Sequence, residues 1–320
     1  MTSLIEQAAL RLEQLRRAGA VVVEPRPAQR LPGGGQAAVM PAPEARVAAP
    51  AVESRKVELD FAVLAAAGIL VPHATRSILG DQFRVIKRPL IRNAVGKGAA
   101  KIAHGNLIMI TSALAGEGKS FTAVNLAMSI AAELDHTVML VDADVARPSV
   151  SRMLGLASST EAGFGPGLLD VLDGRADMSS ALLKTNIDKL TVLPSGTQHA
   201  RATELLASDS MTRLLDEMGR RYPDRIIIFD SPPLLLTTEA RVLATHMGQV
   251  VIVVHAGRTL QADVQSALTT IENCPVRLML LNRAQAAADS GYGYGYGYGY
   301  GYGQGGTAPS DTSILEAPTG

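Results

Sequence analysis

The sequence is poor in cysteine, in net charge and in long apolar runs, and each shortage excludes a class of protein. The single cysteine, Cys274, cannot form an internal disulfide, and with no secretory leader either we expect a reducing, cytoplasmic location. The 30 acidic and 30 basic side chains balance, which argues against nucleic acid as the main partner. The longest apolar stretch, residues 61–72, is too short to span a bilayer. The six histidines lack metal-ligand spacing, so no zinc site is expected.

Composition divides the 320 residues into four parts. Residues 3–17 carry apolar side chains on one helical face, so residues 1–20 are predicted to form an amphipathic helix. This helix either docks to a partner or folds back on its own domain, and the sequence favours neither. Residues 21–57 are rich in proline, alanine and glycine, which predicts a disordered linker. Residues 58–289 are predicted to be the globular domain, and a disordered tail follows to residue 320.

The most informative stretch is A-L-A-G-E-G-K-S at residues 113–120. The apolar run before it, residues 107–110, predicts a buried strand. Residues 121–134 follow it with apolar side chains at every fourth position, which predicts a helix. A glycine-rich loop between a strand and a helix is the setting in which proteins hold the phosphates of a nucleotide.

Each residue type in this loop suits that chemistry. Gly116 and Gly118 allow backbone N–H groups to face phosphate oxygens. Lys119 would reach the outer phosphates, and the hydroxyl of Ser120 would hold Mg²⁺. The first glycine of the usual motif is Ala113 here. A plain glycine-rich turn is the alternative interpretation of the same residues.

Five more apolar runs follow the loop, and helical stretches such as residues 204–220 and 260–272 lie between most of them. Apolar strands that alternate with helices predict an α/β fold with a mostly parallel sheet covered on both faces. In such sheets ligands bind at the carboxyl ends of the strands. The predicted strands are residues 137–141, 190–193, 225–229, 249–254 and 277–281.

Aspartates follow two of these strands. Asp142 and Asp144 come directly after residues 137–141, and Asp230 follows residues 225–229. Mg²⁺ prefers such oxygen ligands, and a second carboxylate beside it can accept a proton from an attacking hydroxyl. Each aspartate alone is equally typical of a helix N-cap. Because all of them lie at strand ends, in order after the phosphate loop, phosphoryl transfer is favoured.

The end of the chain is a repeat of glycine and tyrosine, which alternate strictly over residues 291–303. A segment that is half glycine cannot build a packed core, so we expect it to be disordered with exposed phenols. The six tyrosines of this cluster, out of seven in the chain, are Tyr292, Tyr294, Tyr296, Tyr298, Tyr300 and Tyr302.

Together these motifs resemble those of the bacterial tyrosine autokinases of polysaccharide export loci, which are P-loop enzymes of the deviant Walker, partition-ATPase-like branch. The resemblance rests on G-E-G-K-S at residues 116–120, V-D-A-D-V-A-R-P-S at 141–149, I-I-I-F-D-S-P-P at 226–233 and the tyrosine cluster. It covers residues 58–302. Within the family, the separate N-terminus, the missing membrane segments and V-A-R-P resemble the soluble autokinase of exosortase-associated exopolysaccharide loci.

The resemblance implies ATP and Mg²⁺ as cofactors. It implies catalytic roles for Lys119, Asp142 and Asp144, and it implies that Ser120, Asp142 and Asp230 hold the metal. Asn282 would contact adenine, with a plain turn residue as the alternative. The implied nucleotide-binding residues are Ala115, Gly116, Glu117, Gly118, Lys119, Ser120, Phe121 and Asn282.

The resemblance also implies a ring of identical subunits. Residues 81–87, D-Q-F-R-V-I-K, resemble the family's Glu-x-x-Arg-x-x-Arg helix, which packs against the nucleotide site of the neighbouring subunit. Lys87 lacks the bidentate fork of arginine, so Arg88 is an alternative to it. The expected interface residues are Asp81, Arg84, Lys87 and Arg88.

We therefore expect ATP-dependent autophosphorylation of the tail tyrosines, on a neighbouring subunit, that regulates exopolysaccharide synthesis or export. The implied partner is a membrane-spanning chain-length protein, a polysaccharide co-polymerase, which would recruit the chain to the inner face of the membrane. A positioning ATPase of the same branch is the main alternative, but residues 114–119 lack the early lysine typical of that group. An adhesive Gly-Tyr tail regulated by the ATPase is a third reading.

Overall fold

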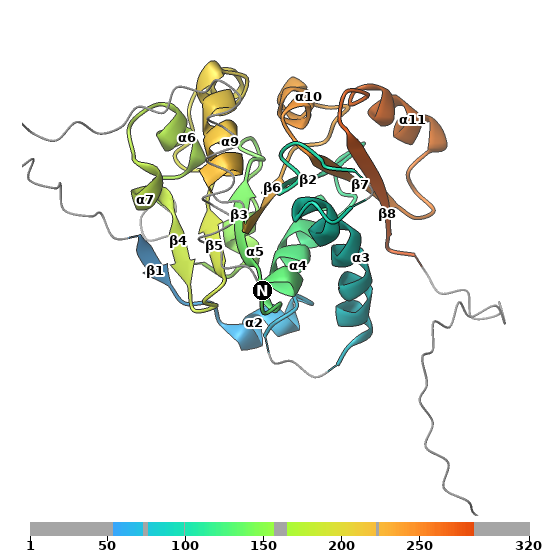
Figure 1. Cartoon of the computed structure of the whole chain (residues 1–320), viewed down its shortest axis with the longest axis horizontal. Coiled ribbons are helices and arrows are strands. Elements are labelled where there is room, and N and C mark those ends of the chain that lie inside the picture. Colours follow the sequence, from blue (N-terminus) through green and yellow to red (C-terminus); the bar gives the residue numbers. More distant parts are fainter. Residues whose placement is uncertain (1–53, 73–75, 99, 157–164, 222–223, 285–320) are drawn as a thin grey trace, which may run out of the picture. The chain divides into compact units, whose positions relative to one another are not determined.

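A mostly parallel sheet forms the middle layer of the computed structural model, which describes residues 54–72, 76–98, 100–156, 165–221 and 224–284 (Figure 1). Its strands are β1 (Arg55–Val57), β2 (Leu107–Ser112), β3 (Thr137–Asp142), β4 (Leu183–Thr185), β5 (Leu190–Leu193), β6 (Arg225–Asp230), β7 (Gln249–His255) and β8 (Val276–Asn282). The strand order is β1-β4-β5-β3-β6-β2-β7-β8. β4 is antiparallel to β5, and β1 is parallel to β4, so these two strands run opposite to the other six.

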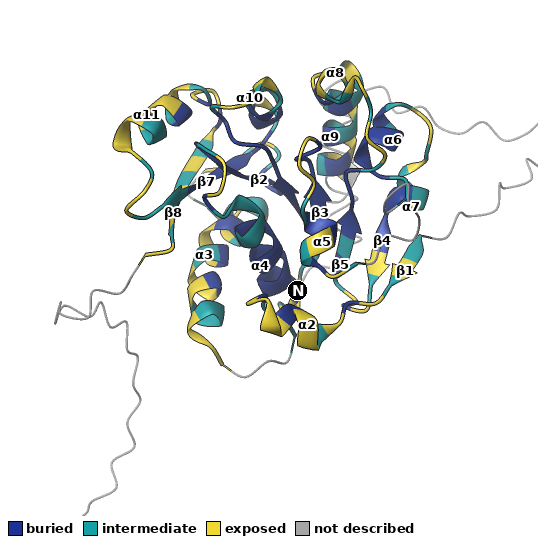
Figure 2. Ribbon diagram, turned by 180° about the vertical axis from the view of Figure 1, so that it is seen from behind, coloured by how far each residue is buried: buried dark blue, intermediate teal, exposed yellow. Residues whose placement is uncertain are grey.

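Helices cover both faces of this sheet, and the alternation of side chains along the strands explains why. Ile108 and Ile110 of β2 pack in the core under the first group of helices, whereas Leu107 and Met109 pack under the second. Figure 2 shows the buried residues concentrated in the central strands and on the helix sides that face them. The first group is α2 (Phe61–Ala66), α3 (Ile78–Ala94), α4 (Lys119–Ala131) and α5 (Val150–Met153). The second is α6 (Leu168–Leu172), α7 (Met178–Ala181), α8 (Ala202–Leu206), α9 (Asp209–Arg221), α10 (Thr238–Thr245) and α11 (Gln261–Thr269).

The six strands predicted from apolar runs are confirmed, and two strands at one edge were missed. β1 and β4 have three residues each and a lysine in the middle, which is too short and too polar for a periodic pattern. β1 also corrects a boundary, because residues 55–57 fall inside the predicted linker, residues 21–57, but pair with β4. The predicted N-terminal helix and the Gly-Tyr repeat lie outside the described residues.

Two helix predictions differ from the structure at their ends. Residues 204–220, predicted as one helix, form α8 and α9, because Ser208 interrupts them and its hydroxyl accepts the N–H of Met211 at 3.3 Å. The helix of the phosphate loop ends at Ala131, so Leu134 lies beyond it and is 87% exposed. None of the helices that the structure describes is both long and apolar enough to cross a membrane.

Helix α3 carries the expected interface residues, and one of them points inward. Asp81 pairs with Arg76 at 2.9 Å and with Arg84 on the surface, and Arg88 is exposed. Lys87, in contrast, is 5% exposed. Its Nζ lies 2.5 Å from Oε1 of Glu133 and 2.6 Å from the carbonyl oxygen of Ser129.

The inward position of Lys87 corrects its assignment to a subunit interface. Helical periodicity places it on the same side of α3 as Phe83 and Leu90, both of which are buried against the domain. Its ammonium group therefore joins α3 to the end of α4 inside one chain. Arg88 remains on the surface of the helix.

Replacing Lys87 by alanine should lower the free energy of unfolding by about 1–3 kcal/mol, because the carbonyl of Ser129 and the carboxylate of Glu133 lose a buried partner. Replacing exposed Arg88 by alanine should change it by less than about 0.5 kcal/mol. Urea unfolding of both variants measures the difference. Equal stability of the two variants would contradict an internal role for Lys87.

Candidate nucleotide and metal site

The phosphate loop passes from β2 to α4 through two glycines in the left-handed region of backbone space. Gly116 has φ 82° and Gly118 has φ 96°, values that side chains disfavour. A Cβ on Gly118 would also lie 2.1 Å from Nδ2 of Asn282. That same amide donates to the carbonyl oxygen of Glu117 at 2.9 Å. The end of β8 therefore contacts the phosphate loop directly.

Glu117 closes the loop on itself and attaches it to a distant segment. Its Oε2 accepts the N–H of Leu114 at 2.8 Å, and the hydroxyl of Thr259, which follows β7, donates to its Oε1. Thr259 in turn accepts the N–H of His255 at 3.1 Å. The carboxylate is buried and each of its oxygens accepts a hydrogen bond from within the protein, so it holds the loop in shape.

Lys119, the first residue of α4, lies among carboxylates from two neighbouring strands. Its Nζ is 2.6 Å from Oδ2 of Asp144 and 4.0 Å from Oδ1 of Asp230. The hydroxyl of Ser120 is 3.4 Å from the same nitrogen. β3 and β2 both pair in parallel with β6, so the carboxyl ends of the three strands lie together and bring these groups to one end of the strands.

Asp142 ends β3, and its two carboxylate oxygens have different surroundings. Its Oδ2 accepts the N–H groups of Ser149 and Val150 at 3.0 Å each, and so it stabilises the start of α5. Its Oδ1 is buried without a partner in hydrogen-bond geometry. The two roles considered for this residue, helix capping and metal binding, therefore use different oxygens.

Burial raises the pKa values of the two aspartates at the site, whereas neighbouring carboxylates decide the pKa of Lys119. Burial, helped by the charge of Asp230, raises the pKa of Asp142 to about 7. Burial also raises the pKa of Asp230 to about 6, although Lys119 opposes the rise. For Lys119, burial lowers the pKa, but the carboxylates of Asp230 and Asp144 outweigh it and the net shift is upward. The site thus holds a firmly charged cation and two carboxylates that are reluctant to ionise.

The donor set suits a small divalent cation. Both oxygens of Asp230 and Oδ1 of Asp142 are buried without a hydrogen-bond partner, which is costly for carboxylates unless a cation compensates. In the part of the chain that the structure describes, no group of three or more His, Cys, Asp or Glu side chains is arranged to hold a metal. Two carboxylates and the hydroxyl of Ser120 would leave the other positions to water and phosphate oxygens, as Mg²⁺ prefers.

The other residues of the predicted motifs lie around the group formed by Lys119, Asp142 and Asp230. Ala115 and Gly116 are exposed at the tip of the loop, and Phe121 lies one residue past Ser120 on α4, beside an apolar groove. Arg147 is exposed, and its N–H donates to Oδ1 of Asp144 at 3.1 Å. Sequence reasoning missed Thr259, because 142 residues separate it from Glu117 and nothing in its local sequence marks it.

Replacing Asp230 by asparagine should raise the midpoint of thermal unfolding in EDTA, and more at pH 8 than at pH 5. The folded protein binds this proton more tightly than the unfolded chain, so stability is lost as the pH rises through about 6. The rise from 3.8 to about 6 corresponds to at most about 3 kcal/mol.

Calorimetry at the two pH values measures the change. Asp144→Asn is the control, since it weakens the 2.6 Å hydrogen bond of Lys119, a contact that Asp230 does not make, and should lower the midpoint. A lower midpoint for Asp230→Asn at both pH values would contradict the conclusion that the buried charge of Asp230 destabilises the folded protein.

Replacing Glu117 by alanine should weaken binding of Mg-ADP about tenfold, because the unpaired N–H of Leu114 and the detached Thr259 leave the loop poorly ordered. Glu117→Gln keeps a carbonyl oxygen for Leu114 and should lose less. Titration calorimetry compares the three proteins. Unchanged affinity in the alanine variant would show that the carboxylate does not hold the loop.

Known proteins are similar to this chain in sequence and in fold. The pattern of the AAA domain family matches residues 105–281. The tyrosine-protein kinase YwqD of Bacillus subtilis is 32% identical over 204 residues, which cover 64% of this chain and 80% of that relative. The tyrosine-protein kinase CpsD of Streptococcus pneumoniae serotype 4 is 35% identical over 161 residues, covering 50% and 67%.

Among solved structures, the chimerical protein CapA2B2 superposes with a TM-score of 0.55 at 25% identity, covering 72% of this chain and 93% of that one. On the strength of its AAA domain, its phosphate site and these relatives, the chain belongs to the bacterial tyrosine-protein kinase family.

Proposed function

We propose that this protein is an ATP- and Mg²⁺-dependent tyrosine autokinase that phosphorylates the Gly-Tyr repeat of a neighbouring copy of itself. The observation that carries the proposal is the position of Lys119 among the buried carboxylates of Asp144 and Asp230, at the edge of the sheet from which β8 leads into the repeat. The proposed acceptors are Tyr292, Tyr294, Tyr296, Tyr298, Tyr300 and Tyr302.

Each group at the site has a role in this reaction. Lys119 would leave Asp144 for the outer phosphates, since both compete for the same ammonium group. Ser120, Asp142 and Asp230 would hold Mg²⁺, which neutralises phosphate charge. The phenol oxygen bonds to the γ-phosphorus as the bond to the β-phosphate oxygen breaks, ADP leaves, and the released Asp144 accepts the phenol proton. Asn282 would contact the adenine base.

The exit of the chain supports the tail as acceptor. Asn282 ends β8 in contact with the phosphate loop, and Tyr292 follows ten residues later. A flexible chain of ten residues spans about 17 Å, enough to reach either its own site or that of an adjacent subunit. The family resemblance favours the adjacent subunit, and Asp81, Arg84 and Arg88 on the surface of α3 are the proposed ring contacts.

We extend the proposal to the cellular setting on the family resemblance alone. The enzyme would act at the cytoplasmic face of the membrane with a membrane-spanning chain-length partner, in exopolysaccharide synthesis or export of the exosortase-associated type. Residues 1–20 are the proposed docking helix for such a partner. The family follows from the motifs at 116–120, 141–149 and 226–233, and the subtype from the separate N-terminus, the missing membrane segments and V-A-R-P.

Intact-mass spectrometry of phosphatase-treated protein incubated with Mg-ATP should show a ladder of up to six phosphate additions. Lys119→Met should show none, because the phosphates lose their cation, and a variant with all six tail tyrosines replaced by phenylalanine should show none, because the acceptors are gone. ATP hydrolysis without added mass, also in the presence of candidate membrane partners, would point to a positioning ATPase.

A mixture of the same two variants tests transfer between subunits. The six-phenylalanine chain has the site but no acceptor, and Lys119→Met has the acceptors but no active site. Phosphate on the Lys119→Met chain would demonstrate transfer between chains. A mixture without phosphate, beside an active wild-type protein, would restrict the reaction to each chain's own tail.

A further inference from the structure

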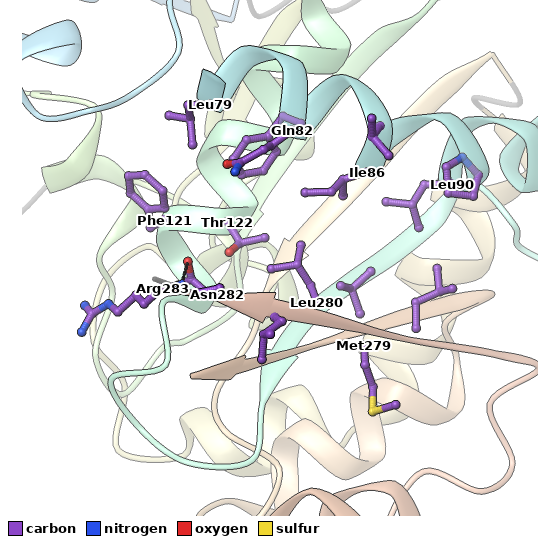
Figure 3. A pocket seen from close by; sticks show the side chains of 17 residues that line it. Leu79, Gln82, Ile86, Leu90, Phe121, Thr122, Met279, Leu280, Asn282 and Arg283 are labelled. Atoms are coloured by element: carbon purple, nitrogen blue, oxygen red, sulfur yellow. Dashed lines mark hydrogen bonds between the residues drawn. The ribbon is translucent and has the colours of Figure 1, made fainter. Parts of the chain in front are cut away.

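An apolar groove of about 670 Å³ runs between α3 and β8, next to the phosphate loop (Figure 3). Among the 17 described residues that line it, Arg283 is the only charged one. The walls are largely aliphatic: Val85 and Ile86 come from α3, and Leu278 and Leu280 from β8. A groove so poor in charge suits an uncharged occupant.

One wall of the groove is the free edge of the sheet. β8 is the last strand in the order and pairs with β7 alone. Figure 3 shows Leu280 directed toward α3 and Met279 directed away from it, and Met279 is exposed. An edge strand with apolar side chains on both faces is a template for one more strand.

The sequence supplies an occupant of matching chemistry and periodicity. The described chain ends at Ala284, two residues beyond β8, and residues 291–303 contain only glycine and tyrosine. In an extended strand successive side chains point to opposite faces, so strict alternation places every tyrosine on one face and every glycine on the other. The segment is uncharged and apolar on the tyrosine face, like the groove.

We propose that the unphosphorylated Gly-Tyr segment turns back and pairs antiparallel with β8, with its tyrosine rings in the groove beside α3. Residues 283–290 separate β8 from the repeat, and a connection of eight residues is long enough for the chain to reverse its direction. β8 has seven residues, about 23 Å, which accommodates three or four tyrosines of the added strand. The rings lie across from Leu278 and Leu280, an aromatic–aliphatic pairing that stabilises neighbouring strands.

Phosphorylation reverses this docking, a consequence that rests on the proposed function. Each phosphate adds about −1.5 to −2 charges, and within the groove it meets only Arg283 as a counter-charge. The unmodified repeat is thus stored along β8, and the modified repeat is released. Docking itself requires neither ATP nor kinase activity.

Amide hydrogen exchange on the full-length Lys119→Met chain, phosphatase-treated and without nucleotide, tests the docking. Exchange in residues 291–303 should be at least about tenfold slower than in a matched chain with all six tail tyrosines replaced by serine. Val85→Asp should abolish this protection, because it places a charge in the groove. Ile78→Asp is the matched control, since Ile78 is exposed on the same helix but does not line the groove, with 81% exposure against 71% for Val85.

Three outcomes would overturn the proposal. The first is equal exchange in the tyrosine and serine chains. The second is protection that survives Val85→Asp in a chain whose circular dichroism is unchanged. The third is protection that disappears on dilution, which would identify a second copy as the occupant. If phosphorylation of the wild-type chain makes exchange in residues 291–303 fast again, the release step is supported. If the chain does not phosphorylate itself, the docking result still stands and only the kinase proposal is refuted.

Discussion

The excess of buried carboxylate over buried cation is the constraint on which the site depends. Lys119 faces Asp144 and Asp230, with Asp142 beside them, in a region from which solvent is largely excluded. One ammonium group cannot neutralise three carboxylates, and the pKa values of Asp142 and Asp230 are therefore raised. Protonation or a divalent cation would relieve this imbalance, so the donor set suits a cation such as Mg²⁺.

The sheet makes the imbalance possible. β3, β6 and β2 are adjacent and parallel, so their carboxyl ends deliver Asp142, Asp230 and the phosphate loop to one place without any long-range pairing of side chains. Helices on both faces exclude water from these strands, and burial is the largest cause of the raised pKa values of Asp142 and Asp230. The same helices are held by alternating side chains on β2. Chemistry and packing therefore depend on the same few apolar strands.

Local sequence predicted what depends on local patterns. The six longer strands, the phosphate loop and the aspartates at strand ends could be predicted because each is a run or a motif a few residues long. The direction of Lys87 was not, since it depends on the carbonyl of Ser129 in α4 and on the carboxylate of Glu133 just after that helix. The pair of Glu117 and Thr259 was not either, because it forms only when two distant loops meet at the sheet edge. A contact between two side chains that lie far apart in the sequence cannot be predicted when neither residue belongs to a recognisable local motif.

The close approach of Gly118 and Asn282 has a mechanical consequence. The amide of Asn282 occupies the space that a Cβ on Gly118 would need, and it also donates to the residue before that glycine. The end of β8, ten residues before Tyr292, is thereby hydrogen-bonded to the loop between β2 and α4. A rearrangement of that loop would shift the end of β8 with it, and under the proposed function it would shift the phosphoryl donor and the anchor of the acceptors together.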